Sequence, residues 1–170
     1  SHVAEQLAAL PGYRAAFAKV FPNDPAPVSI ANAQKAIAVF EATLITPNAP
    51  FDRFLRGDAA ALDSEQKAGL KLFIEKGCAS CHAGVNVGGE IYAKFGAVAA
   101  PDAPYRPAGD VGRAAITGNA SDTYVFKVPT LRNITLTAPY FHTGSEQDLM
   151  KVINVMASAQ LGQSLTPVET

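Results

Sequence analysis

Two cysteines and a histidine stand together in the segment Cys78-Ala79-Ser80-Cys81-His82, and their types and spacing imply a specific chemistry. The pattern C-x-x-C-H is the spacing at which two thiols bond to the vinyl groups of a haem while the next residue ligates its iron. The chain has no other cysteine. We therefore interpret this segment as a haem-attachment site, with Cys78 and Cys81 as the covalent links and His82 as one axial ligand.

Three other kinds of site compete for the same residues. A redox dithiol would use Cys78 and Cys81 as an exchanging pair, usually beside a βαβ pattern, but here a helical pattern precedes the motif and glycines follow it. A zinc site needs four ligands, and the other histidines, His2 and His142, are isolated and far apart. A structural disulfide more often links distant segments. Haem attachment fits best, and the redox dithiol is the main alternative.

Size and charge restrict the class of protein. A chain of 170 residues fits one domain. Its 14 basic and 15 acidic residues give a net charge of −1, which provides neither a basic surface for nucleic acid nor a polybasic membrane anchor. No apolar run approaches the ~18 residues that cross a bilayer. Residues 1–10 also lack the pattern of a signal peptide. Because c-type haem is attached outside the cytoplasm, we expect a mature or trimmed chain in the periplasm.

Apolar periodicity and breaker residues predict a mainly α-helical first part. Short helices are expected over residues 2–10 and 12–21, followed by a proline-rich break at 22–27. Ser29 should cap a long helix that ends near residue 45. The buried face of that helix is predicted to consist of Ile30, Ala33, Ile37, Phe40 and Leu44. The connecting turn that follows should fill the core with Phe51, Phe54 and Leu55.

The region around the C-x-x-C-H motif is predicted to surround the haem. A helix should run from Asp63 or Ser64 to Lys76, with Gly77 in the left-handed conformation after its end. From residue 83 to about 141 we expect irregular chain that walls the cofactor, with one short strand at 124–128. In the helix that ends at Lys76, the face turned toward the core is predicted to consist of Leu70, Phe73 and Ile74. The predicted fold is mainly α and c-type cytochrome-like, with helices around one covalent haem and long irregular haem-wrapping loops.

A final helix is expected to supply candidates for the second axial ligand. It should begin at Ser145, with Asp148 completing a capping-box variant, and end near residue 160 before Gly162. Its apolar stripe places Met156 on the inward face and Met150 at the edge. The stripe consists of Leu149, Val152, Ile153 and Met156.

The identity of the sixth ligand decides between electron transfer and catalysis. Position favours Met156, although a methionine on an apolar stripe is often core filler. His142 is the main alternative and would give bis-histidine ligation. The other candidates for the sixth position are Met150, His2, a lysine, a tyrosine or no ligand at all. Methionine–histidine ligation raises the reduction potential and leaves no open site, so it predicts electron transfer. An open position would instead indicate catalysis.

Several segments, taken together and in order, resemble bacterial di-haem cytochrome c peroxidases across essentially the whole chain. In this sequence they read LITPN at 44–48, FDRF at 51–54, GCASCH at 77–82, GVNVGG at 84–89, FKVPTLRN at 126–133, LTAPYFHTG at 136–144 and MASAQLG at 156–162. In that family a C-terminal, high-potential haem takes electrons from a small donor protein, a cytochrome c or a cupredoxin. It relays them to an N-terminal haem that reduces hydrogen peroxide to water.

The resemblance implies roles for particular residues. This chain looks like the C-terminal domain, and Met156 takes the axial role through its place before Gln160-Leu161-Gly162. The family also holds calcium through backbone carbonyls that match Thr137 and Pro139. The residues that we expect to contact the haem propionates, with a solvated surface role as the alternative, are Lys127, Arg132 and Arg113. A homodimer is among the assemblies expected.

The sequence departs from the family in having only one C-x-x-C-H motif, so the peroxidatic haem domain is absent from it. Residues 166–169 resemble a helix start at which the chain stops, which suggests a fragment. We expect residues 1–28 to connect to the missing domain and residues 29–170 to form the haem domain. The alternatives are a stand-alone mono-haem electron carrier and a di-haem enzyme of the type that matures methylamine dehydrogenase. By itself, this chain is expected only to transfer electrons.

Overall fold

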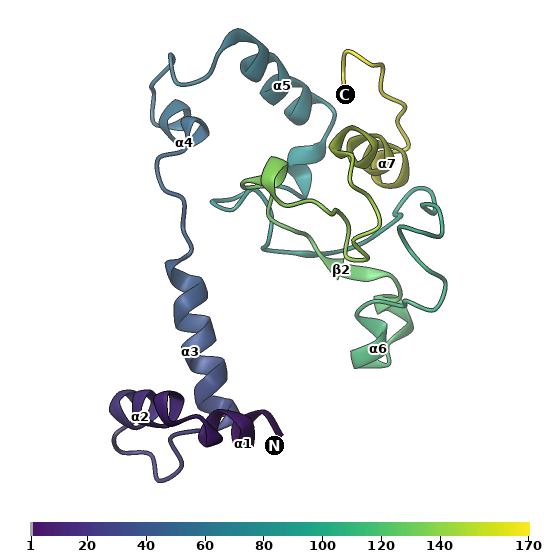
Figure 1. Cartoon of the computed structure of the whole chain (residues 1–170). Coiled ribbons are helices and arrows are strands. Elements are labelled where there is room, and N and C mark those ends of the chain that lie inside the picture. The colour runs from purple at the N-terminus through teal and green to yellow at the C-terminus, as the bar shows by residue number, and fades with distance from the viewer. Residues whose placement is uncertain (1) are drawn as a thin grey trace. The chain divides into compact units, whose positions relative to one another are not determined.

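The computed structural model describes residues 2–170 and is mainly helical, with one small sheet (Figure 1). The chain divides into two compact units, Ser1–Leu62 and Asp63–Thr170. This division lies later in the chain than the predicted boundary after residue 28, so the long helix assigned to the haem domain falls in the first unit. The roles predicted for residues 1–28 and 29–170 stay predictions. No helix among the described residues has the length and apolar character needed to cross a membrane.

The helices of the first unit occur where the sequence predicts them. They are α1 (His2–Ala9), α2 (Pro11–Val20), α3 (Ile30–Thr43) and α4 (Pro50–Leu55). The Ser29 hydroxyl accepts a hydrogen bond from the Asn32 backbone N–H at 3.2 Å, which confirms the predicted cap. The Asn32 side chain is 1% exposed and donates to Asp24 Oδ2 and the Pro27 carbonyl, so it ties the proline-rich break to the start of α3.

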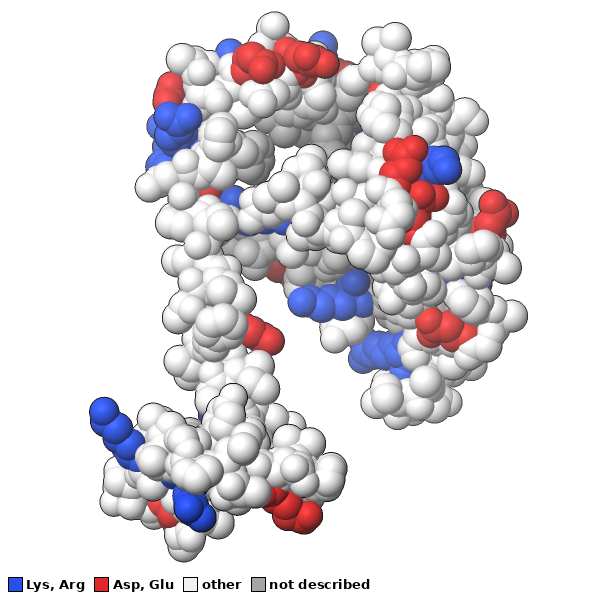
Figure 2. Space-filling view, viewed as in Figure 1, with Lys and Arg blue, Asp and Glu red and all other residues white. Residues whose placement is uncertain are grey.

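The predicted burial of the α3 face is wrong over most of its length. Ile37, Phe40 and Leu44 are 56%, 61% and 65% exposed. The reason is that α1 contacts α3 near its start, and no element described in this unit covers the later turns (Figure 1). In Figure 2 the surface of α3 is mostly uncharged, as expected for a helix that exposes these apolar side chains. Leu55 is exposed as well, whereas Phe51 and Phe54 are half-buried.

The second unit combines two longer helices with short elements. These are α5 (Ser64–Glu75), η1 (Cys78–Ser80), β1 (Tyr92–Lys94), α6 (Ala114–Thr117), η2 (Ala120–Asp122), β2 (Val125–Lys127), η3 (Ile134–Leu136) and α7 (Leu149–Leu161). Strands β1 and β2 are antiparallel, with Tyr92 opposite Lys127. The prediction that residues 83–141 contain no long helix is confirmed, as is a short strand within 124–128. The buried apolar residues of this unit are Phe95, Val128, Tyr140, Ala157 and Ala159.

Local capping explains where α5 and α7 begin. Asp63 and Gln66 form a reciprocal capping box at the start of α5, which begins where the sequence predicts it. The predicted start of α7 at Ser145 is wrong, because the helix is capped by Asp148 instead. The preceding segment is extended: Glu146 pairs with Tyr140 in an isolated bridge, which prevents a helix from starting there. Gly162, with φ of 65°, ends α7 as predicted.

Candidate haem-binding site

The C-x-x-C-H motif forms one tight turn directly after α5. Gly77 has a φ of 92°, a left-handed conformation that glycine adopts without strain, and it turns the chain out of the helix. The Cys78 carbonyl then accepts hydrogen bonds from the backbone N–H groups of Cys81 at 3.3 Å and His82 at 3.0 Å. Both thiols are free and partly buried, and burial raises the pKa of Cys78. Two thiols and an imidazole are thus presented by five consecutive residues.

His82 is held in a state suited to metal ligation. Its ring is half-buried, and burial lowers its pKa more than the nearby backbone of Val87 and Pro129 raises it. The side chain therefore stays neutral near pH 7, which is the form that ligates iron. Among the described residues, His82 Nδ1 is the buried side-chain nitrogen or oxygen without a hydrogen-bond partner.

A glycine loop places His82 next to a backbone carbonyl. Gly88 is buried with a φ of 122°, and a Cβ added to it would overlap the Pro129 carbonyl oxygen and lie 3.1 Å from His82 Nδ1. Nδ1 and this carbonyl therefore both border the space beside Gly88. A histidine that binds a metal through one nitrogen commonly uses the other toward a carbonyl. This arrangement leaves Nε2 as the nitrogen available to iron.

Hydrogen bonds fasten that loop to the segment that follows β2. Four such bonds run from Gly89 N–H to the Val128 carbonyl (2.8 Å), from Leu131 N–H to the Val87 carbonyl (3.1 Å), from Thr130 Oγ1 to the Asn86 carbonyl (2.6 Å) and from Arg132 Nε to the Val85 carbonyl (2.6 Å). Two segments more than thirty residues apart in the sequence thus form one wall beside His82. These residues fit a covalent haem, because free thiols, a neutral imidazole with a shielded Nδ1 and a supporting carbonyl lie together.

Helix α7 carries Met156 in a partly buried position, whereas Met150 is 48% exposed. Gln160 lies one turn after Met156 and fixes the helix to residues 94–97. Its Oε1 accepts from the N–H groups of Gly96 at 2.6 Å and Ala97 at 3.0 Å, and its Nε2 donates to the Lys94 carbonyl at 3.0 Å. Sequence reasoning assigned no contact to Gln160, although a polar residue near the end of an apolar helix was a usable signal. The axial role of Met156 stays a prediction.

Comparisons with known proteins identify the family. Residues 1–60 match the model of the "Di-haem cytochrome c peroxidase" family. The chain is 50% identical to the cytochrome c551 peroxidase of Pseudomonas aeruginosa, over 97% of this chain and 48% of that protein. It is 45% identical to the cytochrome c551 peroxidase of Nitrosomonas europaea, over 98% of this chain and 49% of that protein. The chain belongs to the di-haem cytochrome c peroxidase family.

The same family includes more distant relatives. The methylamine utilization protein MauG of Methylorubrum extorquens is 33% identical over 89% of this chain and 41% of its own length. A solved structure of a MauG-like protein associated with microbial copper homeostasis matches with a TM-score of 0.70 and 30% identity, over 89% of this chain and 47% of that one. The chain spans about half the length of the two cytochrome c551 peroxidases that it matches.

His142, the alternative axial ligand, already has partners. Its Nε2 lies 2.7 Å from Asp110 Oδ2, and its ring stacks on Phe126 with centroids 4.2 Å apart. The ring also meets Phe95 edge-on. These contacts occupy one ring nitrogen and one ring face, so they favour a structural role for His142 over iron ligation. His2, the other histidine outside the motif, lies on α1 in the first unit.

The residues predicted to contact the haem propionates and to bind calcium lie in the second unit. Arg113 pairs with Asp122 at 3.3 Å and lies over the Tyr92 ring, while Lys127 is exposed on β2. Arg132 belongs to the wall beside His82, as described above. Among the described residues, no three His, Cys, Asp or Glu side chains gather as a metal site. The predicted calcium ligands are the backbone carbonyls of Thr137 and Pro139. The roles of the propionate-binding residues and of these calcium ligands stay predictions.

Proposed function

We propose that this chain is the electron-transfer haem domain of a periplasmic di-haem cytochrome c peroxidase. In this proposal it accepts electrons from a small donor protein, a cytochrome c or a cupredoxin, and passes them to a peroxidatic haem in another part of the protein, where hydrogen peroxide is reduced to water. Cys78 and Cys81 would attach haem c, and His82 and Met156 would be its axial ligands. Bound haem c supplies one-electron oxidation and reduction.

The observation that carries the proposal is the neutral, half-buried His82 imidazole beside two free thiols. The turn fixes the order of these groups, because Cys81 and His82 both bond to the Cys78 carbonyl. The absence of a side chain at Gly88 leaves the Pro129 carbonyl and His82 Nδ1 bordering the same space, which suits a histidine that binds metal through its other nitrogen. A thioether from Met156 would stabilise the reduced state and leave no ligand position for peroxide. These residues therefore support electron transfer rather than peroxide chemistry at this site.

A pyridine haemochrome assay and a redox titration on the purified 170-residue chain test this proposal. We expect one covalent haem per chain and a clearly positive potential. We also expect negligible peroxide consumption. Absence of covalent haem, a strongly negative potential, or rapid peroxide turnover with Met156 still ligated would each contradict it.

Two other functions can be separated by simple observations. A stand-alone mono-haem carrier would be encoded by a gene with one C-x-x-C-H motif, whereas the relatives are about twice as long as this chain. An enzyme of the MauG type is favoured by the two MauG-related matches, and it would use a tyrosine as axial ligand. The buried Tyr140 hydroxyl, however, already donates to the Ile134 carbonyl at 3.0 Å.

We also propose calcium binding through the carbonyls of Thr137 and Pro139, and a homodimer of the whole protein. Both proposals rest on the family resemblance. Isothermal titration of the chelator-treated chain with calcium tests the first, because a flat titration would show that these carbonyls are insufficient by themselves. Analytical ultracentrifugation of the whole protein tests the second.

A further inference from the structure

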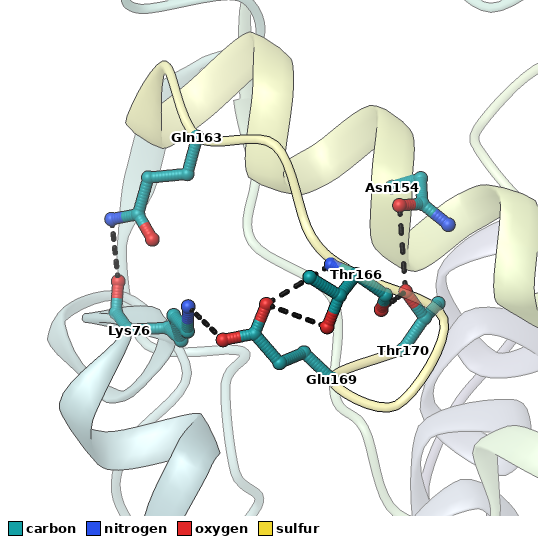
Figure 3. A network of polar contacts seen from close by, with 6 residues as sticks. All are labelled: Lys76, Asn154, Gln163, Thr166, Glu169 and Thr170. Atoms are coloured by element: carbon teal, nitrogen blue, oxygen red, sulfur yellow. Dashed lines mark hydrogen bonds and ion pairs between the residues drawn. The ribbon is translucent and has the colours of Figure 1, made fainter.

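The segment after α7 returns to the end of α5, immediately before the haem-attachment turn. Lys76 Nζ and Glu169 Oε1 lie 2.5 Å apart although they are 93 residues apart in the sequence. Gln163 Nε2 also donates to the Lys76 carbonyl at 3.2 Å. Figure 3 shows both contacts, which join the end of α5 to the chain that leaves α7.

The Glu169 carboxylate is held from both of its oxygens. While Oε1 bonds Lys76, Oε2 accepts from the Thr166 N–H and the Thr166 hydroxyl, each at 3.0 Å (Figure 3). These bonds lower the pKa of Glu169 to about 2, with Lys76 as the largest cause. Thr170 closes the turn through its bond to the Thr166 carbonyl. The residues that resembled a helix start therefore form a single turn that aims Glu169 at Lys76.

A third contact connects the attachment turn to α7 itself. A Cβ on Gly77 would lie 3.9 Å from Leu161 Cδ2, so the backbone just before Cys78 packs against the last residue of the helix. Met156 lies five residues earlier on the same helix, and His82 lies five residues after Gly77. The contacts of Lys76 and Gly77 therefore bridge the two elements that carry the proposed axial ligands.

We propose that Lys76 and Glu169 are positioning residues whose ion pair holds the haem-attachment turn against the end of α7 and so sets the place of Met156 relative to His82. This inference rests on the proposed function, since it concerns the ligand pair assigned there. Exposed ion pairs usually contribute little. This pair differs because both side chains are only 27% and 26% exposed, and because Thr166 holds the second oxygen of the same carboxylate.

Helix α5 offers a matched control for this pair. Lys71 and Glu75 are 3.7 Å apart and 73% and 56% exposed, and they connect α5 only to itself. Lys71→Gln therefore removes one lysine charge from the same helix without touching α7. Lys76→Gln removes the same charge together with the bridge. Lys76→Arg keeps the charge and should retain the contact.

The test uses the haem-loaded 170-residue chain and compares wild type with Lys76→Gln, Glu169→Gln, Lys76→Arg and Lys71→Gln. Amide hydrogen exchange of residues 77–82 should accelerate roughly fivefold in Lys76→Gln and Glu169→Gln, as expected for a partly buried ion pair. The methionine–iron absorption band should weaken, and the potential should fall as the thioether is held less firmly. Lys76→Arg should be close to wild type, and Lys71→Gln should match it in all three measurements.

Two results would overturn the inference. One is a Lys76→Gln protein indistinguishable from Lys71→Gln in exchange, band and potential. The other is acceleration spread evenly over the whole second unit, which would show general destabilisation. If Lys76→Gln folds poorly, Lys76→Arg decides, because it keeps the charge and leaves the Thr166 bonds to Glu169 intact. It should retain wild-type protection of residues 77–82, and loss of that protection contradicts the proposal. A wild-type chain without the methionine band would refute the proposed ligation instead, while the exchange comparison would still test the bridge.

Discussion

The attachment turn at residues 78–82 and helix α7 supply the two proposed axial ligands, but they are positioned by different kinds of contact. The turn is ordered mostly by neighbours in the sequence, through Gly77 and the Cys78 carbonyl. Helix α7 and the segment that follows it are held by distant partners: Gln160 in the helix bonds residues 94–97, and Glu169 after the helix bonds Lys76. One ligand can therefore be located from a local motif, whereas the position of the other depends on how remote segments meet.

The strongest test of the turn side is Gly88→Ala. The added Cβ would meet the Pro129 carbonyl, and the φ of 122° is unfavourable for alanine. We expect a loss of about 2–3 kcal/mol of unfolding free energy, measured by urea denaturation. Gly109→Ala is the control, since a Cβ there meets nothing within 4 Å. Equal stability of the two variants would show that the Gly88 backbone does not lie as close to the Pro129 carbonyl and His82 as described.

The corresponding test of α7 is Gln160→Leu. It removes three hydrogen bonds and leaves the N–H groups of Gly96 and Ala97 without their partner. The expected loss is about 2 kcal/mol in the same denaturation experiment. Gln147→Leu, at an exposed position outside the helix, should change stability by no more than about 0.5 kcal/mol. If Gln160→Leu were equally mild, distant contacts would not be what orders α7.

Acid should weaken the α7 side in a defined range of pH. The pKa of Glu169 falls from 4.5 to about 2 on folding, so its contribution is complete above pH 4.5 and is lost as pH falls through about 2. Stability of wild type and Glu169→Gln should therefore converge between these values. Thermal unfolding across this range measures the difference between the two proteins. A difference that grows as pH falls would contradict the assignment.

The smallest loss of stability is expected on α3, which belongs neither to the attachment turn nor to α7. Ile37 is 56% exposed, so Ile37→Ala should cost no more than about 0.5 kcal/mol in the 170-residue chain. Ala157→Gly, at a position with 6% exposure within α7, should cost about 1 kcal/mol or more. Urea denaturation of the two variants makes the comparison. A loss above about 2 kcal/mol for Ile37→Ala would mean that the α3 face is covered in solution.

Features set by neighbours in the sequence could be predicted, whereas features set by remote contacts could not. The caps at Ser29 and Asp63 and the glycines that end α5 and α7 were predictable, because each acts on residues within a few positions. The start of α7 was not, because Glu146 pairs with Tyr140 rather than entering the helix. Periodicity identified the apolar face of α3 but could not show whether anything covers it.

For the site, the motif pointed to Cys78, Cys81 and His82, and helical periodicity together with the family resemblance pointed to Met156. None of these signals indicated that Gln160 and Glu169 would hold α7 and the segment after it in place. A glutamine and a glutamate carry no pattern that names their partners, since these lie 64 and 93 residues away in the chain. Such contacts emerge only from the folded structure.

The most direct test of the central assignment is the visible absorption spectrum of the oxidised haem-loaded chain in wild type, Met156→Ala and Met150→Ala. We predict that wild type and Met150→Ala show the weak long-wavelength band of methionine–iron ligation, and that Met156→Ala lacks it. A band that persists in Met156→Ala, or one that is absent from wild type, would contradict the ligation of haem by His82 and Met156.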